Sequence, residues 1–219
     1  MKNKMLLGLM LISIPLVYLI VIYNSLPQLV SMDYNLNGEA GDKVPKSQVF
    51  ILTAGLSLLT LIVLLLLSLI HKLSPKMSPV ANSKRMQNIA LLVTGFLVFV
   101  QCWLIHIFQY GIEGSTLKLL LIAMGILFAL IGNYFPNLKP NYVAGYRTPW
   151  SLKNADNWRK THNLAGKVWF FGGLIMCFLS ILLPFKIAFI VSAIAFLCLL
   201  IIPGVYSYRL YKKGIALVF

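Results

Sequence analysis

Residue types that could do chemistry gather in one polar stretch, residues 133–167. It carries six Lys and Arg, two tryptophans and one histidine. Trp158 and His162 are four residues apart, so they share one face if this part is helical. Arg147 can direct several hydrogen bonds that a lysine cannot reproduce. We therefore expect Arg147 to tie a turn to the ends of the flanking helices, with Trp158 and His162 packed beneath it.

Catalytic chemistry has few other candidates in this chain. The three histidines are far apart in the sequence, at His71, His106 and His162. The three cysteines lie within apolar runs, at Cys102, Cys177 and Cys198. A metal site needs clustered ligands at suitable spacing. General acid–base catalysis needs positioned carboxylates, and the chain has only five acidic residues. We expect no enzymatic activity and neither a metal nor a cofactor.

The elements that must position the polar stretch are membrane spans. Hydrophobic residues make up 59% of the chain and charged residues only 11%, which excludes an ordinary soluble domain. Six apolar runs are long enough to cross a bilayer. They cover about Met5–Tyr23, Val49–Ile70, Asn88–Phe108, Leu117–Ile131, Val168–Leu183, and a last run that ends near Pro203. The predicted fold is all-α, an integral membrane bundle of six transmembrane helices.

The connection between the fourth and fifth spans is expected to hold a short interfacial helix. Three prolines and a glycine favour turns in its first half. In the second half, Asn154 is a plausible N-cap with Asp156 in the first turn. Gly125 and Ala129 are four residues apart and would let the fourth span pack closely. We divide the chain into residues 1–48 (first span and loop), 49–131 (spans two to four) and 132–219 (polar stretch with spans five and six).

Charge predicts the orientation of the bundle. With the N-terminus inside, the outer segments hold only Lys43, Lys46, Lys118 and Lys186, and the other 15 of the 19 Lys and Arg lie inside. Four of the five acidic residues lie outside. The positive-inside rule therefore places both termini and residues 133–167 in the cytoplasm. The net charge of +14 then faces anionic membrane lipids, so we expect no direct nucleic-acid binding.

Several motifs within the polar stretch carry a resemblance. They are Gly132-Asn133-Tyr134, Gly145-Tyr146-Arg147-Thr148-Pro149-Trp150 and Trp158-Arg159-Lys160-Thr161-His162. Together they resemble the signature of the SdpI family, bacterial plasma-membrane proteins whose namesake protects its own cell against a secreted, SdpC-type peptide toxin. The namesake also draws a cognate repressor to the membrane once toxin is bound. The resemblance implies toxin immunity, with toxin sensing and a cytoplasmic repressor as further implications.

The same resemblance selects candidate functional residues in the signature. They are Asn133, Asn141, Gly145, Arg147, Thr148, Pro149, Trp150, Trp158, Thr161, His162 and Gly166. Two interpretations stay open for them. They either anchor an interfacial segment among lipid headgroups, or they serve function directly, as a surface on which a cytoplasmic partner docks or as a structural core on which the outer, toxin-facing side depends.

The loop between the first two spans resembles the segment that precedes the signature in this family, although Asp33 stands where the family commonly has histidine. The loop is acidic, so a cationic peptide would be attracted to it over about a Debye length. The candidate toxin contacts are Pro27, Asp33, Asn35, Gly38, Glu39 and Asp42. The alternatives for the whole chain are a small transporter or efflux component and an assembly partner of another membrane protein.

Overall fold

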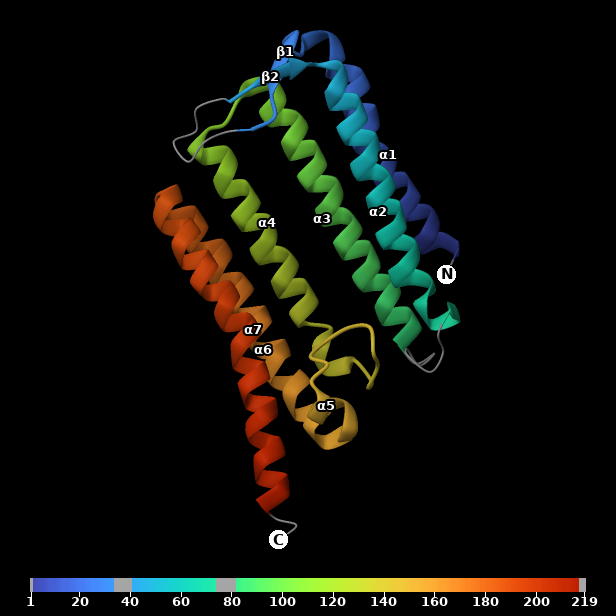
Figure 1. Cartoon of the computed structure of the whole chain (residues 1–219), viewed down its shortest axis with the longest axis vertical. Helices are drawn as coiled ribbons and strands as arrows, with labels where there is room; N and C mark the ends of the chain where they lie inside the picture. The colour runs from blue at the N-terminus through green and yellow to red at the C-terminus, as the bar shows by residue number, and fades with distance from the viewer. Residues whose placement is uncertain (1, 34–40, 74–81, 217–219) are drawn as a thin grey trace.

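The computed structural model describes residues 2–33, 41–73 and 82–216 (Figure 1). Six of its helices are long and apolar enough to cross a membrane, as the sequence predicts. They are α1 (Lys2–Ile22), α2 (Ser47–Leu73), α3 (Ser83–Tyr110), α4 (Gly114–Gly132), α6 (Ala155–Leu182) and α7 (Phe185–Ala216). A short helix, α5 (Pro149–Lys153), lies between α4 and α6, so the predicted fold class is confirmed.

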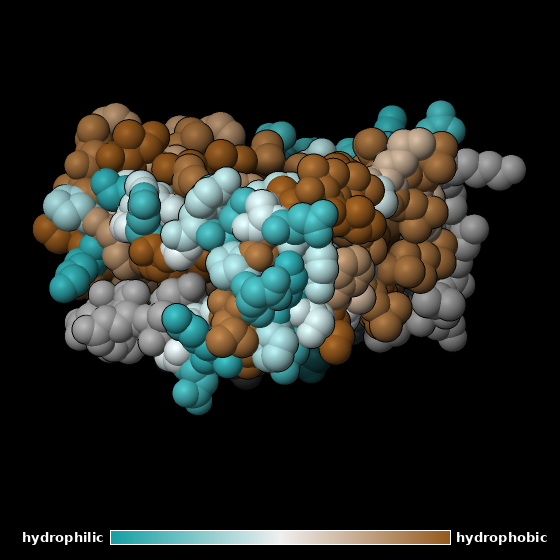
Figure 2. Space-filling view, turned by 90° about the horizontal axis from the view of Figure 1, so that it is seen from above, coloured by the Kyte–Doolittle hydropathy of each residue, from teal (hydrophilic) through white to brown (hydrophobic). Residues whose placement is uncertain are grey.

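The helices form two groups of three. α1, α2 and α3 pack against one another, as do α4, α6 and α7, and the two groups meet along α3 and α4 (Figure 1). Both termini lie at the end of the bundle that carries the α4–α6 connection, residues 133–154, which we call the loop end. The opposite end carries two short strands, and we call it the hairpin end. Seen from there, hydrophobic side chains cover much of the flanks and polar residues gather between them (Figure 2).

The hairpin end holds the non-helical part of the first connection. β1 (Leu29–Ser31) pairs with β2 (Lys43–Pro45) in an antiparallel register that sets Val30 opposite Val44, and a 3-10 turn, η1 (Tyr23–Ser25), precedes them. Val30 is buried with residues from α1, α2 and α3 in one apolar cluster. Strands of three residues are too short for an alternating pattern to be seen in the sequence, and this small sheet was not predicted.

The boundaries of the last two spans differ from the prediction. The Asn154 side chain accepts hydrogen bonds from the backbone N–H groups of Asp156 and Asn157, so it is the predicted N-cap. The helix that it begins is not a separate interfacial helix, because α6 continues for 28 residues through the fifth span. The sixth span does not end near Pro203 either, since α7 runs past it to Ala216.

Glycines let α4 and α6 approach very closely. A Cβ on Gly125 would lie 2.7 Å from the Gly173 carbonyl oxygen, and one on Gly132 would lie 2.6 Å from the backbone nitrogen of Phe170. On α6, a Cβ on Gly166 would lie 3.0 Å from the Gly132 carbonyl oxygen. The predicted close packing of α4 is therefore correct, and its partner is α6. Small residues of this kind are how membrane helices gain contact area without a hydrophobic driving force.

Candidate functional site

Trp158 and His162 form the centre of the loop end. They lie one turn apart on α6 and stack, with ring centroids 3.9 Å apart and an interplanar angle of 18°. Only 2% of Trp158 and 1% of His162 is exposed. Polar side chains are rarely buried so completely unless their hydrogen bonds are made. The predicted shared face is thus present, and it points into the protein and not toward lipid headgroups.

Every ring nitrogen of this pair has a partner. The Trp158 indole N–H donates to the Leu138 carbonyl at 2.8 Å. Nδ1 of His162 lies 2.9 Å from the Trp158 carbonyl oxygen, and its Nε2 lies 3.1 Å from the backbone nitrogen of Tyr146. A carbonyl must accept and a backbone N–H must donate, so the imidazole is neutral with its hydrogen on Nδ1. His162 therefore connects α6 to the α4–α6 connection.

Gly145 allows that connection to reach the imidazole. Its φ is +97°, a left-handed conformation that L side chains rarely adopt. A Cβ at this position would also collide with Nε2 of His162. Both observations require glycine here, since the backbone must turn sharply and pass close to the Nε2 edge of the ring.

Tyr146 inserts from the connection into the seam between α6 and α7. Its hydroxyl donates to the Leu199 carbonyl and accepts a hydrogen bond of 2.8 Å from the Trp169 indole N–H. In a regular helix the Leu199 carbonyl would accept from residue 203, but Pro203 has no N–H. Neighbouring side chains can satisfy a carbonyl freed in this way in a membrane helix. Burial raises the pKa of Tyr146 to about 12, so the phenol remains a donor at physiological pH.

A buried polar network joins the connection to both helices. The Asn157 side chain on α6 donates to the Ser207 carbonyl on α7 at 2.9 Å. Its oxygen accepts from the hydroxyl of Ser207 at 2.7 Å and from that of Thr161 at 3.0 Å. The Thr148 hydroxyl lies 3.1 Å from that of Ser207. The Ser207 hydrogen already goes to Asn157, so Thr148 donates here. Satisfied networks of this kind select one arrangement of their elements.

Thr148 also begins α5. Its hydroxyl accepts from the backbone N–H of Ser151 at 3.2 Å, while the Ser151 hydroxyl accepts from the backbone N–H of Thr148 at 3.0 Å. This is a capping box with serine in place of the usual glutamate. Pro149 is exposed in the first turn of α5, where its missing N–H costs nothing. Trp150 stacks on Tyr211 of α7 with centroids 5.7 Å apart.

The first half of the connection is fixed by two asparagines. The Asn141 side chain accepts from the backbone N–H groups of Val143 and Ala144 at 2.9 and 2.8 Å. Asn82, just before α3, is fully buried and makes two 3.0 Å hydrogen bonds with the backbone of Lys139. The connection is therefore attached to both three-helix groups.

Arg147 does not play the expected part. It is exposed, and its guanidinium donates to the Tyr142 carbonyl at 2.8 Å, within the connection itself. The residue that ties the turn to the helices is its neighbour Tyr146. His162 does pack against this turn, through Gly145 and Tyr146, whereas the Trp158 indole bonds to Leu138 earlier in the connection.

The structure places the remaining signature candidates in different surroundings. Asn133 is exposed at the C-terminal end of α4, away from the stacked pair. Gly166 packs against Pro136, because a Cβ there would lie 2.7 Å from the proline ring. Thr161 and Asn141 are buried in the networks described above. The signature thus combines a buried set with a few exposed positions.

At the hairpin end, Pro27, Asp33 and Asp42 are exposed. Gly41 donates its backbone N–H to the Asp33 carbonyl at 3.0 Å, and a Cβ on it would collide with the Asp33 carboxylate. The other three candidate toxin contacts lie outside the described residues: Asn35, Gly38 and Glu39.

Sequence reasoning missed several residues of the buried set. They are Asn82, Tyr146, Asn157, Trp169, Pro203 and Ser207. One signal was available, since a proline inside an apolar run must free the carbonyl four residues earlier, and a nearby donor is then required. In the part of the chain that the structure describes, no three His, Cys, Asp or Glu side chains group as metal ligands would. The contacts of the loop end hold the α4–α6 connection against α6 and α7. We call this set of hydrogen bonds the lock: His162 with Tyr146, Tyr146 with Leu199, and Asn157 and Thr148 with Ser207.

Comparison with known proteins agrees with the resemblance seen in the sequence. Residues 137–207 match the sequence model of the SdpI/YfhL protein family. The chain is 23% identical over 214 residues to "Immunity protein SdpI" of Bacillus subtilis (strain 168), covering 96% of this chain and 97% of that protein. No solved structure matches. The chain is a distant homologue of that immunity protein over nearly its full length.

Proposed function

We propose that this SdpI/YfhL family homologue is a multi-pass immunity protein of the bacterial plasma membrane, which protects its cell against a secreted peptide toxin. One observation carries the proposal, the similarity to an immunity protein over 96% of the chain. The similarity includes α1–α3 and the hairpin end, well beyond the family match at residues 137–207. The loop end, the hairpin end and the spans are therefore all included in the similarity to that immunity protein.

The interior of the bundle favours immunity over transport. Transporters place ionisable groups along a path within their spans. Three buried polar side chains of α2 and α3 satisfy one another, since Ser57 donates to Gln101 at 2.9 Å and Gln101 donates to Thr60 at 3.0 Å. Such contacts hold helices together. Among the described residues they offer no charged relay for a substrate.

The proposed toxin-facing surface is the hairpin end, which the positive-inside rule predicts to lie outside the cell. Asp33 and Asp42 are exposed there beside the paired strands, and Glu113 is exposed at the start of α4. Exposed carboxylates raise the local concentration of a cationic peptide. The apolar flanks seen from the hairpin end (Figure 2) would receive the hydrophobic face of an amphipathic peptide.

A sensing role is a finer part of the same proposal. The cytoplasmic loop end exposes cations on α5 and on the last turns of α7, among them Lys153 and Lys213. Trp150 and Tyr211 stack between these two elements. An aromatic patch ringed by cations suits docking of a repressor protein with an acidic surface. This role would use exposed residues, while the buried lock keeps α5 and α7 in place.

The test is a challenge with an SdpC-type secreted peptide toxin. Cells that lack the protein should become sensitive, and expression of the protein should restore tolerance. Purified protein in vesicles should bind the peptide without moving it across the membrane. Peptide flux in these vesicles would instead identify an efflux component, and unchanged sensitivity of the deletion strain would reject immunity.

A further inference from the structure

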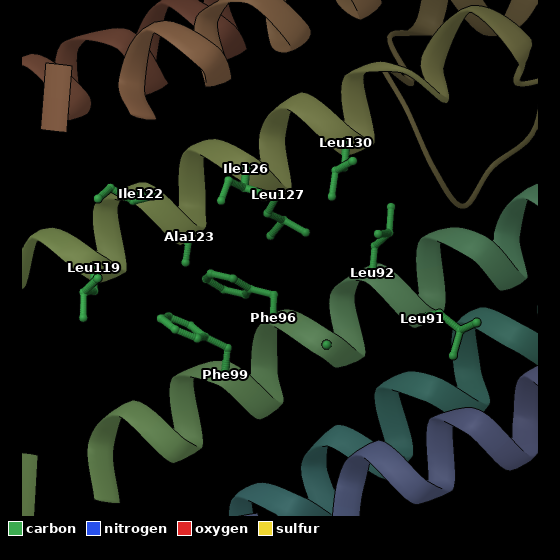
Figure 3. A pocket seen from close by; sticks show the side chains of 11 residues that line it. Leu91, Leu92, Phe96, Phe99, Leu119, Ile122, Ala123, Ile126, Leu127 and Leu130 are labelled. Atoms are coloured by element: carbon green, nitrogen blue, oxygen red, sulfur yellow. The ribbon is translucent and has the colours of Figure 1, made fainter. Parts of the chain in front are cut away.

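An apolar groove opens where the two three-helix groups meet. It has a volume of about 400 Å³ and lies between α3 and α4. All of its lining residues are apolar, and they include Leu91, Gly95 and Phe96 of α3 and Leu119, Leu127 and Leu130 of α4. Phe96 and Phe99 extend from α3 toward α4, and Ala123 and Leu127 face them (Figure 3).

Hydrogen bonds join the helices at both ends of this groove. Toward the hairpin end, the Trp103 indole N–H on α3 donates to the Thr116 carbonyl on α4 at 2.8 Å. Toward the loop end, Asn82 is bonded to the backbone of Lys139. The helices are held at their ends but not sealed between them. Side chains facing an unfilled gap lose dispersion contacts, so this groove favours an occupant.

The length of the groove matches one leaflet of a bilayer. On α4 it runs from Leu119 to Leu130, which spans about 16 Å at a rise of 1.5 Å per residue. The hydrocarbon core of a bilayer is about 30 Å thick, so one leaflet contributes about half of that. A single acyl chain of one leaflet fits this length, and the apolar lining offers it no competing polar group.

Cations mark the level at which a headgroup would sit. Lys84 is exposed on α3, seven residues and about two turns before Leu91, so both project from the same face of the helix. Lys139 is exposed in the connection, and its backbone is held by Asn82 next to the start of α3. Two exposed lysines thus lie on the loop-end side of the groove, near the start of α3. Their charge selects an anionic headgroup over a zwitterionic one.

We propose that the α3–α4 groove is a binding site for an anionic phospholipid, with one acyl chain between Phe96 and Leu127 and the headgroup phosphate at Lys84 and Lys139. The lipid completes the interface between the two three-helix groups. This site does not depend on the proposed immunity function, since it rests on the groove and the two lysines alone.

Two glycines provide a matched test. Gly95 lines the groove, Gly55 lies on the exposed face of α2, and a Cβ on either would meet nothing within 4 Å. Each variant, Gly95→Leu and Gly55→Leu, is purified in mild detergent and examined by native mass spectrometry. We expect wild type and Gly55→Leu to retain one phospholipid per chain and Gly95→Leu to lose it. Elution as a single monodisperse peak shows that each variant is folded.

The headgroup is tested with phosphatidylglycerol and phosphatidylethanolamine supplied in equal amounts. Lys84→Gln with Lys139→Gln should lower the retained ratio of anionic to zwitterionic lipid roughly tenfold, because each near-surface cation contributes several-fold. Lys153→Gln with Lys213→Gln removes two cations from the same end and should leave the ratio unchanged. Equal lipid retention by both leucine variants would overturn the proposal. A crosslinker placed at position 123 gives a second test. The proposal would also be overturned if this position crosslinks to a hydrophobic peptide and not to lipid.

Discussion

The hydroxyl of Tyr146 donates to the carbonyl of Leu199, which Pro203 leaves without a helical partner. These two residues are 53 positions apart in the sequence. The contact inserts the α4–α6 connection between α6 and α7. Pro203 removes a backbone hydrogen bond from α7, and the Tyr146 hydroxyl replaces it. The proline and the tyrosine therefore depend on each other.

That dependence can be measured. Tyr146→Phe removes one of two donors to the Leu199 carbonyl and should lower the unfolding free energy by about 1 kcal/mol. Pro203→Ala restores a backbone N–H to the helix, so the same tyrosine change should cost less in that background. Unfolding is followed in detergent for both singles and the double variant. Strict additivity of the two changes would show that the residues are not coupled.

Gly145→Ala is expected to be the most damaging small change in the connection. It combines a left-handed backbone with a collision against His162, which together should cost about 2–4 kcal/mol. Gly204→Ala is the control, because a Cβ on this helical glycine meets nothing within 4 Å. Alanine favours a helix over glycine, so the control should be neutral or slightly stabilised. A thermal melt of both proteins separates the outcomes, and similar melting temperatures would contradict the prediction.

Alkaline pH should weaken the lock through Tyr146. Burial raises its pKa to about 12 in the folded protein from a usual value of 10.0. The folded state therefore keeps a proton that the unfolded chain loses, so this contribution to stability is complete below pH 10 and falls as the pH rises toward 12. The melting temperature of wild type should drop over this range more than that of Tyr146→Phe. Parallel curves for the two proteins would rule out this titration.

The orientation of the bundle is tested by labelling single cysteines. The native thiols Cys102, Cys177 and Cys198 are first replaced by serine. Asp42→Cys and Lys153→Cys then introduce thiols at exposed positions of the hairpin end and the loop end. A membrane-impermeant maleimide should modify position 42 in intact cells and position 153 only after lysis. The reverse pattern would place both termini outside.

The parts of the fold that depend on local composition could be predicted from the sequence. Apolar runs of sufficient length predict spans wherever they occur, and Asn154 before an acidic first turn predicts a helix N-terminus. The extent of α6 could not be obtained in this way. Asn157, Thr161 and His162 make its first turns polar enough to be taken for a membrane surface, but they are buried. Ser207 of α7 satisfies Asn157, Asn157 in turn satisfies Thr161, and Tyr146 of the connection satisfies His162.

The role of Arg147 shows a second limit. Its charge and hydrogen-bonding capacity made it the natural choice for the anchoring residue. The neighbouring Tyr146 makes the anchoring contact instead. The freed Leu199 carbonyl lies inside an apolar seam, so its donor must be neutral and carried by a flat apolar ring. Residue type alone shows which contacts a side chain can make. Which contact it does make here depends on a proline more than 50 positions away.

The close approach of α4 and α6 limits how this protein can move. Their backbones touch at Gly125 with Gly173 and again two turns later at Gly132 with Gly166, so neither helix can slide or roll without a steric clash. α4 and α6 must therefore move as one rigid body, with α7 attached through Leu199 and Ser207. We expect any relative motion of the two groups at the α3–α4 seam, which the Trp103–Thr116 and Asn82–Lys139 hydrogen bonds join at its two ends. A ligand that tilts α1–α3 at the hairpin end would then rotate these three helices about the two hydrogen bonds, and so shift them at the loop end.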